Sequence, residues 1–368
     1  MITQALREVE ESDKALAAAF ERRLDAIKVI AEYRREHGIP VPAEPDGGER
    51  AQELSAVITD AEKRPYYMSF FQGALSASEK YHRRIMQGVR VAYTGVKGAF
   101  ANIAASRIFP EGEMVSYPDF AASYTAVERG ECDCAVLPIE NSYAGEVGQV
   151  IELMFSGKLY IGGVYSLRVK HNLLGLRGST PSGVKKVVSH PQALHQCAPY
   201  IQAHGYECIQ ETNTAVAAQR VAEGGDPTVA AIASAETAKL YGLEVLDHDI
   251  NESGDNTTRF AVFSRTPNID EDHRDRSRFL LMFILQNVPG ALASAINVIS
   301  SYGFNMKVIR SRPIKEPAWE YYFYVEAEGD EESENGRRMI SELRQHCRVL
   351  KVVGHYSDDI RLGASSII

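Results

Sequence analysis

The sequence is short of cysteine, and this shortage excludes two kinds of small scaffold. Five cysteines are scattered over 368 residues, which does not suit a disulfide framework. Cys132 and Cys134 stand two apart, which is not zinc-ribbon spacing, and no second pair accompanies them. We therefore expect a reduced, cytoplasmic protein without a structural metal.

Long apolar runs and excess positive charge are also missing. No apolar stretch is long enough to span a bilayer, and the first residues show neither the basic region nor the apolar core of a signal peptide. The formal net charge is −9, which argues against nucleic acid or an anionic membrane as a partner. Small-molecule partners remain, in a chain whose apolar and charged fractions, 45% and 24%, are ordinary for a globular protein.

The periodicity divides the chain into three domains and a tail, a multidomain fold. Residues 1–88 keep helical spacing and predict an all-α domain of three helices. The first helix ends near residue 38, and the other two cover residues 49–63 and 66–86. Residues 89–267 alternate short strands with helices, which indicates an α/β domain with mostly parallel sheets. Residues 266–278 are a linker. Residues 277–357 follow the order βαββαβ of a ferredoxin-like α+β unit, and 358–368 are a loosely held tail.

Polar side chains gather at the strand ends of the middle domain. They comprise the glycine turn Gly95–Gly98, Glu140-Asn141, Ser189-His190-Pro191-Gln192 with Gln196, Glu211, and Asn256 to Phe260. Ligands bind at the carboxyl ends of strands in open α/β sheets, so these groups can face one cleft. Each also has a structural interpretation, since turn glycines are common and carboxylates and amides cap helices.

Together these segments resemble the prephenate dehydratase family over residues 90–265. The resemblance implies removal of water and carbon dioxide from prephenate, giving phenylpyruvate, in a site between two lobes. It implies Thr258 at the leaving hydroxyl, Arg259 at a substrate carboxylate, and Asn141 and Gln196 orienting the substrate. Either Glu140 or Glu211 is the proton donor if burial raises its pKa. Aromatisation drives the reaction, so no electron sink and no cofactor are expected.

The amino-terminal helices are similar to the all-helical chorismate mutase. The similarity rests on Leu6-Arg7, Glu21 to Asp25, Ala31 to Arg34, and Ser78 in the third helix. It implies a site built from Arg7, Arg23, Arg34, Ser78 and His82. Arg23 and Arg34 share a helix face, whereas Arg7 points nearly opposite, so a dimer that exchanges helices completes the site. This chain has Arg34 and His82 where the family has lysine and glutamine. A helical dimerisation domain without catalysis is the alternative.

The carboxy-terminal domain resembles the ACT domain through Asn287 to Leu292 and Ser311-Arg312-Pro313. The resemblance implies that Gly290, Ala291, Leu292, Ser311, Arg312 and Pro313 bind the effector L-phenylalanine. A glycine at the helix start lets backbone N–H groups approach a carboxylate. Arg310 replaces the glutamate that the family commonly has. A plain dimerisation unit is the alternative.

The sequence therefore predicts a bifunctional chorismate mutase and prephenate dehydratase, inhibited by phenylalanine, that forms a homodimer or homotetramer. A dehydratase with an inactive mutase domain is one alternative. The other is a non-catalytic sensor that binds metabolites in the cleft and in the ACT domain.

Overall fold

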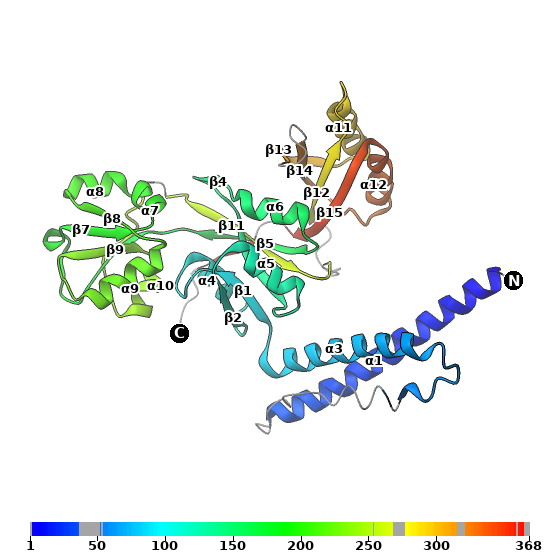
Figure 1. The fold of residues 1–368 in the computed structure, drawn as a ribbon. Coiled ribbons are helices and arrows are strands. Elements are labelled where there is room, and N and C mark those ends of the chain that lie inside the picture. Colours follow the sequence, from blue (N-terminus) through cyan, green and yellow to red (C-terminus); the bar gives the residue numbers. More distant parts are fainter. Residues whose placement is uncertain are drawn as a thin grey trace. The chain divides into compact units, whose positions relative to one another are not determined.

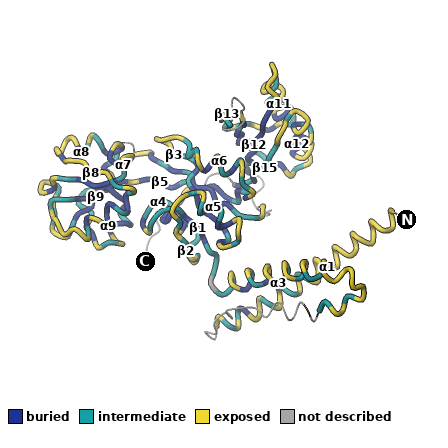
Figure 2. The backbone as a smooth tube through the Cα atoms, viewed as in Figure 1, coloured by how far each residue is buried: buried dark blue, intermediate teal, exposed yellow. Residues whose placement is uncertain are grey.

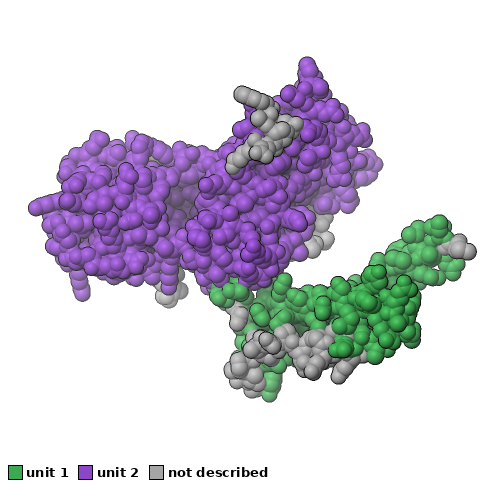
Figure 3. All heavy atoms as spheres, viewed as in Figure 1, with its two compact units in different colours: residues 1–90, 111–113 green, residues 91–110, 114–368 purple. Residues whose placement is uncertain are grey.

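A computed structural model describes residues 2–36, 52, 54–252, 254–267, 277–314, 321–357 and 360–363. The chain forms two compact units, Met1–Arg90 with Glu111–Glu113, and Val91–Pro110 with Met114–Ile368 (Figure 3). Within the described ranges, no helix combines the length and the apolar character needed to cross a membrane.

The first unit is a pair of packed helices, α1 (Ile2–Glu36) and α3 (Arg64–Gln87). Pro65 occupies the first turn of α3, where its missing N–H costs nothing. Most of α1 is exposed, including Leu6 and Val9 (Figure 2). The first and third predicted helices are confirmed. The predicted helix at 49–63 is wrong for residues 56–63, which form turns and irregular chain, while part of its start lies outside the described residues.

The first lobe of the second unit is a seven-stranded sheet of order β16-β5-β11-β3-β1-β2, with β4 paired to β3 (Figure 1). Its elements are β1 (Arg90–Thr94), α4 (Phe100–Ile108), β2 (Glu113–Tyr117), α5 (Phe120–Glu128), β3 (Cys134–Asn141), β4 (Gly145–Glu146), α6 (Gly148–Ser156), β5 (Tyr160–Arg168) and β11 (Thr257–Ser264).

The second lobe has a five-stranded sheet of order β10-β6-β9-β7-β8. Its elements are β6 (Asn172–Gly175), a 3₁₀ turn (Pro181–Gly183), β7 (Lys186–Ser189), α7 (Pro191–Gln196), α8 (Ala198–His204), β8 (Glu207–Gln210), α9 (Thr214–Gly224), β9 (Val229–Ala233), α10 (Ala235–Tyr241) and β10 (Glu244–Asp247). The chain enters this lobe between β5 and β6 and leaves it between β10 and β11.

Both sheets are mixed, so the prediction of mostly parallel sheets is wrong. β1 runs parallel to β3, but β11 runs antiparallel to both β3 and β5. In the second lobe, β7 is parallel to β8 and β9, whereas β6 is antiparallel to β9 and β10. The reason lies in the connections: a chain that crosses to another lobe and returns is free to re-enter the sheet in the reverse direction.

The third sheet has the order β13-β14-β12-β15, and the predicted succession βαββαβ is confirmed. It comprises β12 (Ser277–Leu285), α11 (Ala291–Ser301), β13 (Asn305–Pro313), β14 (Tyr321–Glu328), α12 (Glu334–His346) and β15 (Cys347–Ser357). Most of the predicted linker lies outside the described residues.

Both faces of this third sheet are buried, as the alternation along β12 shows. Phe279, Leu281 and Phe283 pack in the core beneath α11 and α12. Leu280 and Met282 instead join the core of the first lobe. Gly354 in β15 lets the two layers approach, because a Cβ there would lie 2.3 Å from the carbonyl oxygen of Ile161 in β5.

The prediction of a loosely held tail is wrong for three of its residues. β16 (Ile360–Leu362) pairs in parallel with β5. The outer edge of β5 offers unpaired backbone N–H and C=O groups, which even a short strand can satisfy. The pairing brings Arg361 beside Ser166.

Candidate active site between the two lobes

A cavity of about 1040 Å³ lies between the two lobes of the second unit, and we name it the front cavity. The first lobe lines it from the ends of β1, β3 and β11, and the second lobe from the starts of α7 and α9. The lining includes Thr94, Gly95, Asn141, Glu146, Val169, His171, His190, Gln192, Gln196, Asn213, Asn256 and Thr258.

Asn141 fixes the orientation of the Thr258 hydroxyl. The two residues are register partners on β3 and β11, and Asn141 Nδ2 donates to Thr258 Oγ1 at 2.9 Å. Asn141 Oδ1 accepts the backbone N–H groups of Tyr143 and Ala144, at 3.0 and 2.9 Å. Backbone N–H groups require an oxygen, so the amide cannot be reversed. Thr258 Oγ1 is therefore an acceptor, and the described residues provide no acceptor for its own proton.

A chain of amides continues from Asn141 into the second lobe. Asn141 Nδ2 also donates to Asn256 Oδ1 at 2.8 Å, and Asn256 Nδ2 donates to Gln196 Oε1 at 2.9 Å. Gln196 Oε1 lies 2.9 Å from His171 Nε2. Because an amide oxygen only accepts, His171 Nε2 carries the proton. The two backbone amides at 143 and 144 thus set the polarity of a network that joins both lobes.

His171 is a member of this network that sequence reasoning missed. It is 2% exposed, and burial lowers the pKa of its imidazole, so the ring is neutral near pH 7. Its Nδ1 has no hydrogen-bond partner among the described residues. The available signal was weak: His171-Asn172 is a polar pair at the start of β6, a strand that was not predicted.

Glu140 and Arg259 do not reach the front cavity, contrary to the roles expected of them. Glu140 precedes Asn141 on β3, and Arg259 follows Thr258 on β11. Because successive side chains of a strand point to opposite faces, Glu140 and Arg259 point away from the cavity. Arg259 donates to Glu140 at 3.1 Å and makes a bidentate pair with Glu326 of β14, at 3.1 and 3.0 Å. Both residues therefore lie where the first lobe meets the third sheet.

The Glu326 carboxylate is the buried centre of this contact. It is 1% exposed and also accepts hydrogen bonds from Tyr324 and Tyr356. Burial alone would raise the pKa of Glu326, but the Arg259 guanidinium and the two phenol groups hold it below the ordinary value. The carboxylate is ionised and permanently engaged.

Glu211 lies at the rim of the cavity rather than in its lining. The following residues, Thr212 to Thr214, do line it. The Glu211 carboxylate accepts the N–H of Thr212 at 2.9 Å and pairs with Arg220 at 3.3 Å. These contacts lower the pKa of Glu211, and the backbone hydrogen bond from Thr212 is the largest cause. A general acid needs a raised pKa, so this environment does not suit that role.

The front cavity has no lysine or arginine among its described lining residues, and Glu146 is its single carboxylate. Arg310 and Arg312 of β13 hold Glu146, at 2.7 and 2.8 Å. Burial would raise the pKa of Glu146, but these two arginines keep it below the ordinary value. Anionic groups of a ligand must therefore be held by N–H and O–H donors.

The first unit brings together four of its five predicted site residues. Arg23 Nε donates to Ser78 Oγ at 3.0 Å, and an Arg34 nitrogen lies 3.5 Å from His82 Nε2. Ser78 and His82 are buried, and burial and Arg34 lower the pKa of His82. Arg7 is exposed on α1, sixteen residues before Arg23, and is not part of this group.

The predicted effector residues lie at one end of the third sheet. Gly290, with φ of +83°, begins α11 just after β12, beside Ala291 and Leu292. Ile284 pairs with Tyr322, and Tyr322 pairs with Arg312, so Ser311 to Pro313 end at the same side of the sheet. Ser311 and Pro313 are exposed, whereas the Arg312 side chain is directed to Glu146.

Comparisons with known proteins find several relatives of this chain. A family model described as prephenate dehydratase matches residues 91–268. "Arogenate dehydratase/prephenate dehydratase 2, chloroplastic" of Arabidopsis thaliana is 34% identical over 323 residues, covering 85% of this chain and 83% of the relative. The bifunctional chorismate mutase/prephenate dehydratase of Aquifex aeolicus is 29% identical, covering 95% of this chain and 96% of the relative. The structure of a prephenate dehydratase from Arthrobacter aurescens in complex with L-Phe superimposes with a TM-score of 0.67 at 25% identity, covering 73% and 90%.

Proposed function

The chain belongs to the prephenate dehydratase family, and from this premise we propose that its front cavity converts prephenate to phenylpyruvate, water and carbon dioxide. The observation that carries the proposal is the hydroxyl of Thr258, whose oxygen accepts from Asn141 so that its proton can be donated to a substrate. Such a donor suits a reaction in which an oxygen leaves as hydroxide.

The chemistry needs little more than this donor. The ring carbon–oxygen bond breaks as hydroxide leaves, and the electrons of the carbon–carboxylate bond enter the ring as carbon dioxide departs. A prephenate dianion gives a phenylpyruvate monoanion, carbon dioxide and hydroxide, so one proton completes the water. Thr258 stabilises the charge that develops on the leaving oxygen, and Gln196 of the second lobe and Asn256, next to β11, orient the substrate.

The proton itself comes from water in this proposal. Glu140 is bound by two arginines outside the cavity, and the surroundings of Glu211 lower its pKa. Glu140 is not part of the cavity lining, and the lowered pKa of Glu211 does not suit an acid catalyst at neutral pH. A hydroxide ion leaving into a hydrated cavity needs only a hydrogen-bond donor during bond cleavage.

The substrate is prephenate rather than arogenate. Arogenate carries an ammonium group in place of the ketone oxygen of prephenate. Glu146, the single carboxylate in the described lining, is already engaged by Arg310 and Arg312. An ammonium group would thus lack a free counter-charge, whereas a ketone oxygen finds N–H and O–H donors.

Two further activities complete the proposal, with a three-domain layout of 1–88, 89–267 and 277–357. The helical domain rearranges chorismate to prephenate, supported by the grouping of Arg23, Arg34, Ser78 and His82 and by the relative from Aquifex aeolicus. The third domain is an ACT domain that binds phenylalanine in a cytoplasmic homo-oligomer. The structure of the relative with L-Phe supports this effector.

One experiment tests all three parts. Purified protein is given chorismate, prephenate or arogenate, and prephenate and phenylpyruvate or phenylalanine are followed separately, with and without added phenylalanine. We expect turnover of chorismate and prephenate, and a lower prephenate rate with phenylalanine. Turnover of prephenate alone would leave the helices as a dimerisation domain. Binding without any turnover would make the protein a sensor and refute the proposal.

A further inference from the structure

A second cavity, of about 1090 Å³, lies behind the front cavity, and we name it the rear cavity. Val169 and His171 line the front cavity, whereas the alternate residues Arg168, Lys170 and Asn172 line the rear cavity. In the same way, Thr258 lines the front cavity and its neighbour Thr257 lines the rear cavity. Because neighbouring side chains of extended chain point to opposite sides, the two cavities flank the same connections between the lobes.

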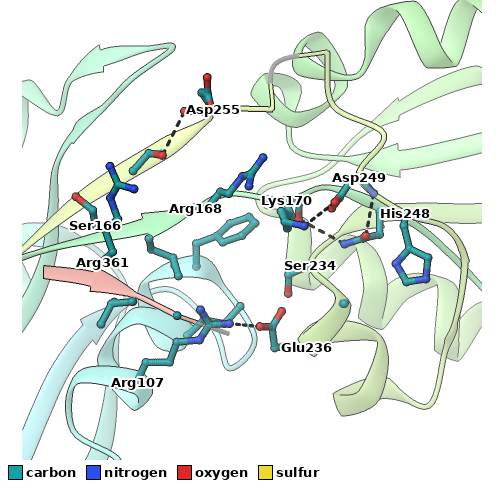
Figure 4. A pocket seen from close by; sticks show the side chains of 18 of the residues that line it. Arg107, Ser166, Arg168, Lys170, Ser234, Glu236, His248, Asp249, Asp255 and Arg361 are labelled. Carbon is teal, nitrogen blue, oxygen red and sulfur yellow. Dashed lines mark hydrogen bonds and ion pairs between the residues drawn. The ribbon is translucent and has the colours of Figure 1, made fainter. Parts of the chain in front are cut away.

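The rear cavity is rich in cations, unlike the front cavity. Its lining includes five basic side chains: Arg107, Arg168, Lys170, Arg278 and Arg361. Three carboxylates, Glu236, Asp249 and Asp255, also line it, and Figure 4 shows Glu236 paired with Arg107 and Asp249 paired with Lys170. Five cations against three carboxylates leave an excess positive charge that suits an anionic occupant.

Arg168 and Arg361 supply this excess. Arg361 on β16 pairs with Ser166 on β5, and Arg168 is two residues further along β5, so the two guanidinium groups share one face. Arg168 Nε donates to the carbonyl of Gly254 at 2.7 Å. Within the described part of the chain, neither arginine pairs with a carboxylate. Two neighbouring guanidinium groups match the bidentate geometry of a carboxylate ligand.

The remaining lining residues form an apolar wall on the first lobe and a polar contact surface on the second lobe. Phe100 and Ile103 of α4 and Leu362 of β16 face the cavity from the first lobe. Ser234 and Glu236 line it from the second lobe, as Figure 4 shows around the connecting strands. We propose that the rear cavity is a second binding site, for a small carboxylate with an apolar ring. Its occupant contacts both lobes.

The test is a calorimetric titration of the intact chain with 3-phenylpropionate at low salt, in which the heat of binding is measured. We expect binding to wild type and a dissociation constant at least about tenfold higher for Arg168→Gln/Arg361→Gln. The matched control, Arg129→Gln/Lys239→Gln, removes two exposed cations elsewhere and should bind as wild type does. Equal affinity of wild type and Arg168→Gln/Arg361→Gln, or no binding at millimolar ligand, would overturn the proposal.

Two further ligands test the chemistry of the site. The uncharged 3-phenylpropanamide and inorganic phosphate should each bind at least about tenfold more weakly than 3-phenylpropionate. Phosphate binding of equal strength would show that charge alone selects the ligand, which contradicts the assignment of an apolar ring. Arg361→Gln alone changes a side chain without a hydrogen bond among the described residues, so it reports on binding even if the double variant folds poorly.

Discussion

At the scale of single residues, the oxygen of the Thr258 hydroxyl accepts a hydrogen bond from Asn141, so its proton can be donated to a substrate. We predict that Thr258→Val, which keeps the shape but deletes the donor, lowers kcat by about 100-fold to 1,000-fold. Thr258→Ser should keep most of the rate, and Ser264→Ala, on the same strand, should change nothing. Steady-state kinetics with prephenate measure this, and near wild-type turnover of Thr258→Val would remove the hydroxyl from the mechanism.

Asn141 gives a second prediction at this scale. Asn141→Asp retains an oxygen for the N–H groups of Tyr143 and Ala144, but its other oxygen can only accept. Thr258 would then donate to the introduced carboxylate instead of to the substrate, so we expect a loss of kcat as large as that of Thr258→Val. Because both changes remove the same donation, the double variant should be no slower than either single variant. Additive losses would argue for independent roles.

The sequence predicted candidate residues for this site but not which way their side chains point. Thr258 and Arg259, or Asn141 and Glu140, are neighbours on a strand, so only one of each pair can face a given cavity. Choosing between them requires knowing what covers the other face. That cover is the third sheet, more than sixty residues away, where the buried Glu326 pairs with Arg259. Nothing near Arg259 in the sequence signals this partner.

At the scale of elements, the pair between β11 and β14 should make stability depend on pH. The pKa of Glu326 lies below 4.5, so the unfolded chain takes up this proton first as the pH falls. Its stabilisation is complete above pH 4.5 and is lost as the pH falls through the lowered pKa. Glu326→Gln should cost about 3 kcal/mol or more near neutral pH, because Arg259 loses a buried partner.

The measurement is the melting temperature between about pH 7 and pH 3. Glu326→Gln should show a shallower fall below pH 4.5 than wild type. Glu334→Gln is the matched control, since Glu334 forms an exposed pair with Arg338 and should leave the pH profile unchanged. Identical profiles for wild type and Glu326→Gln would contradict the assignment.

Elements with a long periodic pattern were predictable, whereas pairing between distant strands was not. Helices α1, α3, α11 and α12 and the strands of the third sheet follow from local spacing. Strand β16 has three residues, too few for a pattern to show, and depends on the free edge of β5. The direction of β11 is fixed by a whole lobe inserted before it, which local propensity cannot report.

At the scale of the whole molecule, the proposed mutase site needs two chains, because Arg7 lies apart from Arg23 on one straight helix. Arg7→Ala and Arg23→Ala should each abolish chorismate turnover. Mixed and re-equilibrated, they should recover about a quarter of wild-type activity, since half the dimers are hybrids with one intact site. Activity of a demonstrably monomeric helical fragment would refute this arrangement.

The absence of lysine and arginine from the described lining of the front cavity has a consequence for how substrate arrives. A dianion approaching a protein of net charge −9 meets no local attraction at that entrance, so its diffusional encounter is slowed rather than steered. Added salt screens this repulsion. We expect kcat/KM for prephenate to hold steady or rise as ionic strength increases, measured in sodium chloride at fixed pH. A steep fall of kcat/KM with ionic strength would show that positive charge at the entrance attracts the substrate, which would contradict this prediction.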